Sequence, residues 1–78
     1  AGMLQVYPSP SGGRFTIRWD ASERVRALHV YSAQGRLVHT QRAGTGMSTT
    51  LDLDLPAGAY LVQLRTEDAV LTKTVVVE

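Results

Sequence analysis

The stretch that decides the fold is Arg14-Phe15-Thr16-Ile17-Arg18-Trp19, in which polar and apolar side chains alternate without a break. Strict alternation is typical of a β-strand that buries one face and leaves the other in water. The same period of two recurs at 28–31, 49–54 and 60–65. The last segment, 70–77, is rich in valine and threonine and partly apolar on both faces, so it is either buried on two sides or packed against a neighbour.

Turn-forming residues separate these runs at short intervals, and no stretch of ten residues carries a helical apolar face. Short strands at a spacing of about 8–12 residues predict a sandwich or a barrel. We expect an all-β, immunoglobulin-like antiparallel β-sandwich of about seven strands. It should form a single domain over 1–78, in which residues 1–3 are a linker or a cloning remnant. The expected strands are 3–7, 14–19, 25–31, 36–42, 48–53, 59–66 and 69–77.

The alternation also predicts the core, because the apolar phase of each strand should face the opposite sheet. The residues expected to be mostly buried are Phe15, Ile17, Trp19, Leu28, Val30, Val38, Leu51, Leu53, Tyr60, Val62 and Leu64.

Composition excludes several classes of protein. The chain of 78 residues has no cysteine, so it has neither a disulfide framework nor a thiolate zinc site. The formal net charge is +1, which creates no broad field for nucleic acid or anionic lipid. No apolar run approaches the roughly 20 residues that a membrane helix needs. We therefore expect no nucleic-acid partner and no membrane insertion.

One hairpin register can be argued from the residues. If Val30 and Val38 both face the core, they should lie opposite each other, because directly paired residues share a face. That pairing requires a three-residue loop that ends at Gly35 in the left-handed conformation. The same register places His29 opposite His39 on the outer face.

Two histidines across a hairpin could begin a metal site. Zinc needs three or four ligands, however, and no carboxylate or thiol is positioned to complete the set around His29 and His39. The simpler interpretation is a pair of surface strand residues. We expect no metal and no other cofactor.

The remaining polar and aromatic groups also favour scaffold roles. Asp52 and Asp54 alternate along a strand, which is typical of a solvated face and not of a calcium loop. Trp19 and Phe15 could form a sugar-binding platform, but they are in phase with the expected core. Since no group of residues has the arrangement that catalysis requires, we expect that the chain is not an enzyme.

Three stretches together carry a family resemblance. They are Tyr7-Pro8-Ser9-Pro10 with the glycine turn and strand at 12–17, the hairpin at 30–38, and Leu55-Pro56-Ala57-Gly58-Ala59-Tyr60, with Lys73 on the last strand. In this order and spacing they resemble the C-terminal sorting domain, type A, of the type IX (Por) secretion system of Bacteroidetes-like bacteria. Ser9 departs from the usual asparagine, and the tail has less lysine than is common. The positions that the resemblance marks for family motif or recognition roles are Tyr7, Pro8, Pro10, Gly35, Leu55, Pro56, Gly58, Tyr60 and Lys73.

The motif residues also have physical roles of their own. Pro56 and Gly58 should form a sharp corner before the following strand. Tyr60 can bury its ring and return its hydroxyl to the backbone, as the tyrosine corner of immunoglobulin-like sandwiches does. These are scaffold roles, so we expect function to depend on the shape and edges of the folded module.

The resemblance implies a secretion signal at the end of a larger cargo protein. Such a precursor folds in the periplasm in transit, and the outer-membrane type IX translocon then recognises the domain. A sortase-like surface peptidase commonly removes the domain, leaving the cargo on the cell surface or outside the cell. The alternative is an immunoglobulin-like or fibronectin-like accessory or carbohydrate-binding module of a secreted hydrolase.

Overall fold

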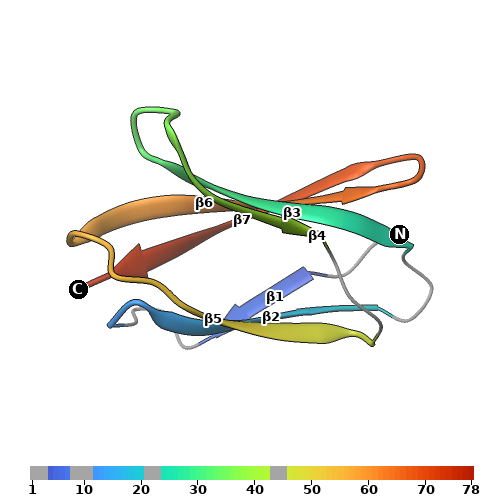
Figure 1. Ribbon diagram of the computed structural model, residues 1–78, viewed down its shortest axis with the longest axis horizontal. Coiled ribbons are helices and arrows are strands. Elements are labelled where there is room, and N and C mark those ends of the chain that lie inside the picture. Colours follow the sequence, from blue (N-terminus) through green and yellow to red (C-terminus); the bar gives the residue numbers. More distant parts are fainter. Residues whose placement is uncertain (1–3, 8–11, 21–23, 43–45) are drawn as a thin grey trace.

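The computed structural model describes residues 4–7, 12–20, 24–42 and 46–78, and these form two packed layers of strands (Figure 1). The strands are β1 Leu4–Tyr7, β2 Arg14–Trp19, β3 Val25–Ser32, β4 Leu37–Arg42, β5 Ser48–Asp52, β6 Gly58–Thr66 and β7 Val70–Val77. Each of the seven predicted strands is confirmed, with boundaries that differ by at most one residue. The period of two therefore located β2, β3, β5 and β6 directly, and the spacing of turn residues located the other described strands.

The two layers are a three-stranded sheet in the order β1-β2-β5 and a four-stranded sheet in the order β4-β3-β6-β7. All strand pairs are antiparallel. The chain crosses between the layers after β2, after β4 and again after β5, so neighbours in the sequence are often not neighbours in a sheet. This arrangement confirms the predicted all-β antiparallel sandwich of immunoglobulin-like type.

The core lies between the inner faces of the two sheets. Phe15, Ile17 and Trp19 of β2 are buried there, as the alternation in this strand predicts. All the other residues expected in the core are buried as well, except Leu53, which is partly buried against it, and Val38, which is exposed. The structure thus confirms the predicted core on β2, β3, β5 and β6, but not on β4.

The last strand resolves a choice that the sequence left open. Val75 and Val77 of β7 are buried in the core, whereas Val76 between them is exposed on the outer face. Val75 lies opposite Tyr60 and Val77 opposite Gly58 on β6. The final strand is therefore part of the core, and the same residues support the beginning of β6.

The hairpin between β3 and β4 has the predicted three-residue loop. The Ser32 amide donates to the Arg36 carbonyl oxygen at 2.8 Å, and the Gly35 amide donates to the Ser32 carbonyl oxygen at 2.9 Å. Gly35 has a φ of 83°, which is the left-handed conformation expected for it.

The predicted register beyond this loop is wrong. Tyr31 lies opposite Leu37, but Val30 lies opposite His39 and not Val38, because the pairing shifts by one residue between Val30 and Tyr31. His29 consequently lies opposite Thr40 and not opposite His39.

The position of β4 gives the physical reason for this shift. Among the described strands β4 contacts only β3, so the opposite sheet does not cover its inner face. Val38 would gain little by facing inward there, and it is 37% exposed. The β-bulge instead places His39 and Gln41 on the inner side, where the His39 Nε2 and Gln41 Oε1 atoms form a hydrogen bond of 2.7 Å.

We predict that Val62→Ala lowers the free energy of unfolding by about 2–4 kcal/mol, because the side chain is fully buried between the sheets. Urea unfolding followed by circular dichroism measures the change. The neighbouring Leu61→Ala is the matched control, since Leu61 lies on the outer face and is 37% exposed. Equal losses from the two variants would contradict the assignment of faces.

Gly13 gives a second stability prediction, because it combines a φ of 102° with close packing. The Leu53 amide donates to the Gly13 carbonyl oxygen at 2.9 Å, and a Cβ added at Gly13 would overlap the Leu53 carbonyl oxygen. Gly13→Ala should therefore destabilise the domain by about 1–3 kcal/mol or more. Gly12→Ala should stay within about 0.5 kcal/mol of the parent, since an added Cβ meets nothing there. A thermal melt in which both variants match the parent would refute the close approach.

Candidate functional site

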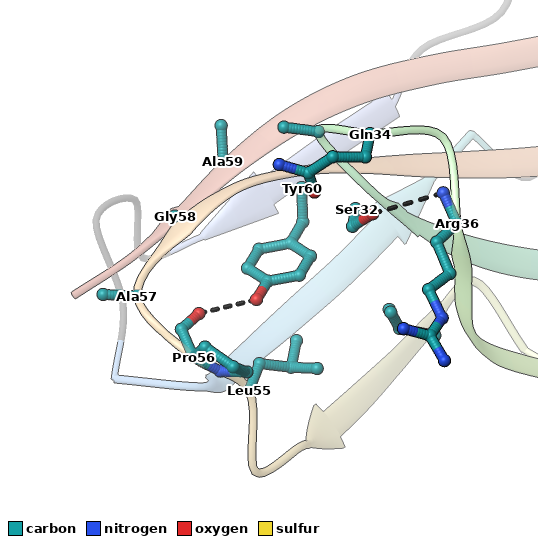
Figure 2. A pocket seen from close by; sticks show the side chains of 11 residues that line it. Ser32, Gln34, Arg36, Leu55, Pro56, Ala57, Gly58, Ala59 and Tyr60 are labelled. Carbon is teal, nitrogen blue, oxygen red and sulfur yellow. Dashed lines mark hydrogen bonds between the residues drawn. The ribbon is translucent and has the colours of Figure 1, made fainter.

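Two motif stretches that are far apart in the sequence meet at one end of the four-stranded sheet. The hairpin between β3 and β4 and the segment before β6 together line a cavity of about 450 Å³, which we call the corner cavity (Figure 2). Its lining residues are Ser32, Ala33, Gln34, Arg36, Val38, Leu55, Pro56, Ala57, Gly58, Ala59 and Tyr60. The pairing of β3 with β6, which sets Ser32 opposite Tyr60, brings the two stretches together.

Tyr60 organises one wall of the corner cavity. Its ring is only 6% exposed, and its hydroxyl donates to the Pro56 carbonyl oxygen at 2.6 Å. This confirms the expected tyrosine corner. Between Pro56 and Tyr60 the chain bends at Gly58, which has a φ of 155°, a conformation that favours glycine. Leu55 continues the wall and packs against the core.

The hairpin supplies the opposite wall, and Figure 2 shows the Tyr60 ring between the Pro56–Gly58 corner and the Ser32–Arg36 side. The Arg36 amide donates to Ser32 Oγ at 3.2 Å, which adds to the backbone bond between these residues. The Arg36 side chain is exposed and makes no ion pair or hydrogen bond with any other described residue. Among the described residues it is the single charged group that lines the corner cavity.

A second depression adjoins the corner cavity on the outer face of the four-stranded sheet. This outer hollow has a volume of about 340 Å³ and is lined mostly by apolar atoms of β3 and β6. Tyr31, Gly35, Leu61 and Thr74 belong to it alone, whereas four residues are shared with the corner cavity: Ser32, Ala33, Ala59 and Tyr60. The two depressions therefore form one continuous surface around the base of the hairpin.

The structure brings together five of the residues marked from the sequence and separates the others. Gly35, Leu55, Pro56, Gly58 and Tyr60 all line the corner cavity or the outer hollow. Tyr7 and Lys73 line neither depression.

Tyr7 ends β1 in the other sheet and is exposed. Lys73 lies opposite the core residue Val62 on the edge strand β7, so it occupies the inner side of that edge and is still exposed. Pro8 and Pro10 lie outside the described residues.

The sequence did not single out Arg36 or Ser32 as site residues. Both lie within the hairpin stretch at 30–38, and the signal for Arg36 was its place directly after the loop glycine. What the sequence could not supply was its position next to the Pro56 corner, which depends on the pairing between β3 and β6.

The structure does not support a metal site at the histidines. His29 and His39 lie on opposite faces of the hairpin, and His29 Nδ1 and Thr40 Oγ1 form a hydrogen bond of 2.9 Å. Over the described ranges, no three side chains of histidine, cysteine, aspartate or glutamate gather where a metal ion could bind. Asp52 and Asp54 are both exposed.

The structure gives no support for a sugar-binding platform formed by Trp19 and Phe15. Trp19 and Phe15 are both buried in the core, as the core-packing interpretation predicts. In the described part of the chain, no helix is long and apolar enough to cross a membrane.

Comparison with known proteins gives one family. The family model described as "Secretion system C-terminal sorting domain" matches residues 5–78. The match thus includes all seven strands except the first residue of β1. A search of curated protein sequences finds no significant match.

We predict that Tyr60→Phe lowers the free energy of unfolding by about 1–2 kcal/mol, because the Pro56 carbonyl oxygen loses its donor while the ring stays buried. Chemical denaturation measures the loss. Tyr7→Phe is the matched control: its ring is 45% exposed and its change should stay within about 0.5 kcal/mol. A Tyr60→Phe variant as stable as Tyr7→Phe would show that the corner bond contributes nothing.

Proposed function

The chain belongs to the family of secretion system C-terminal sorting domains, and we propose that the outer-membrane translocon of the type IX system recognises it as a folded module. A domain of this family is a C-terminal secretion signal for the type IX system. It directs the cargo protein that carries it to the cell surface or the extracellular space. The proposal concerns how this signal is read and what happens to it.

The observation that carries the proposal is the convergence of five motif residues on one folded surface. Gly35, Gly58 and Tyr60 have conformations or bonds that set the shape of the corner cavity and the outer hollow. A signal that is read as an extended peptide would not need a left-handed loop glycine or a buried tyrosine corner. The motif therefore supports recognition of a shape, and we place the recognition surface at these two depressions.

We further propose the order of events for the precursor. The cargo precedes this domain in the chain and crosses the inner membrane through a separate signal. The domain folds in the periplasm, the translocon binds it, and a sortase-like peptidase at the cell surface then removes it. In this sequence the domain is a ligand and a substrate, and its residues catalyse no step.

The first test fuses the 78-residue chain to the C-terminus of a folded fluorescent reporter that carries an N-terminal export signal. In a bacterium with the type IX system, we expect the reporter at the surface or in the medium with the domain, and in the periplasm without it. Cell fractionation measures the distribution. If an established family signal exports the reporter in the same strain and this folded domain does not, the proposed function fails.

The second part of the test asks whether recognition requires the fold. The Gly12→Ala fusion should be exported like the parent, and the Gly13→Ala fusion should be retained once circular dichroism shows its domain to be unfolded. Export of the unfolded Gly13→Ala domain would instead indicate a linear signal. Truncation from Thr74 is a poorer test, because it removes Val75 and Val77 from the core together with any contact to the translocon.

A further inference from the structure

We propose that the corner cavity binds an acidic peptide segment of a partner protein, in which an aspartate or glutamate stands next to a bulky apolar side chain. This inference rests on the proposed function, because it states the chemistry that the recognition surface fits. It follows from three features of the site: apolar walls, one unpaired arginine, and continuity with the outer hollow.

The walls of the corner cavity suit an apolar side chain. Leu55, Pro56 and Tyr60 form one side and Val38 contributes to the other. A volume of about 450 Å³ falls within the range of sites that enclose a small ligand or several side chains. The hydrogen bonds of Tyr60 to Pro56 and of Ser32 to Arg36 hold both walls, so little ordering remains to oppose binding.

Arg36 determines the charge of the expected ligand. Among the described residues, Arg26 pairs with Glu67 at 2.8 Å, and Arg24 lies 3.8 Å from the same carboxylate. Of the exposed arginines that have no such ion pair, Arg36 is the one that lines the corner cavity. No acidic residue lines the corner cavity, and the Arg36 guanidinium has no partner among the described residues. Guanidinium is weakly hydrated and forms two parallel hydrogen bonds with a carboxylate. A carboxylate at this rim would therefore complete the site.

The outer hollow extends the site along the hairpin base. Its lining is mainly apolar, and Tyr31 and Leu61 are the large side chains that it does not share with the corner cavity. Because Ser32, Ala59 and Tyr60 line both depressions, a peptide whose carboxylate reaches Arg36 can place an apolar side chain on either side of this shared wall. The pairing of an acid with a neighbouring apolar residue is thus the pattern that the surface selects.

The probe is a displayed library of random heptapeptides selected on the folded 78-residue chain. We expect enrichment of sequences in which aspartate or glutamate lies one or two residues from leucine, phenylalanine, tyrosine or tryptophan. Enrichment without an acid, or enrichment of basic peptides, would overturn the proposal.

The best peptide is then titrated into variants by calorimetry. Arg36→Ala should weaken binding at least about tenfold, as expected for loss of a hydrogen-bonded charge. Arg36→Lys should retain part of the affinity, because it keeps the charge and loses the planar fork. Arg18→Glu is the matched control, since Arg18 is an exposed β2 residue in the other sheet, and it should leave affinity unchanged.

A charge exchange separates recognition from a general effect of net charge. Arg36→Glu should no longer bind the acidic peptide, and it should bind the same peptide with lysine in place of the acid. Equal losses of affinity for the acidic peptide in Arg36→Glu and Arg18→Glu would show only long-range electrostatic attraction and would refute the site.

The reporter fusion distinguishes this inference from the proposed function. Export by the parent domain and by Arg18→Glu, with loss in Arg36→Glu, supports both. Full export by Arg36→Glu overturns the acidic ligand and leaves the sorting function standing. If the parent domain is not exported while the established signal is, the sorting function fails, and the peptide titrations still decide what the corner cavity binds.

Discussion

Contact between the apolar inner faces of the two sheets is the interaction on which every other part of this domain depends. With 78 residues and no cysteine, the chain has one apolar layer and no covalent cross-link to stabilise it. Phe15, Ile17 and Trp19 of β2 fill the centre of that layer, and Val75 and Val77 of the last strand close one side. The close approach of Gly13 to Leu53 continues the pairing of β2 with β5, whose inner faces line this layer, and the bond from Tyr60 to Pro56 starts from a ring buried in it.

The same layer explains what the sequence could and could not predict. Where a strand is covered by the opposite sheet, alternation is enforced by burial, so β2 and β6 could be assigned to the correct face from their residues alone. β4 lies at an edge that the other sheet does not cover, so Val38 gains no burial there and stays exposed. At the other edge, Val75, Val76 and Val77 are equally apolar, and only pairing with β6 decides which of them face the core. The corner cavity depends on pairing between distant segments, which explains why Arg36 was missed.

Both outer strands of the four-stranded sheet carry polar groups on their inner sides. β4 places His39 and Gln41 there, and β7 places Lys73 opposite the buried Val62. Inward-pointing polar or charged side chains and β-bulges make an edge a poor template for pairing with another chain. In the proposed order of events the folded domain meets other exported proteins in the periplasm, and protected edges leave recognition to a surface other than the edges. This favours the end of the sandwich, where the hairpin and the Pro56 corner meet.

Under the proposed function this domain has to bind the translocon and release it again, which limits how apolar its recognition surface can be. A large apolar patch would give affinity without selectivity and would favour aggregation. The surface at the hairpin base combines small apolar depressions with one uncompensated charge, Arg36. Charge complementarity of this kind contributes more to the rate of encounter and to the choice of partner than to the lifetime of the complex. An arginine beside shallow apolar walls is therefore suited to the transient, selective binding that we propose.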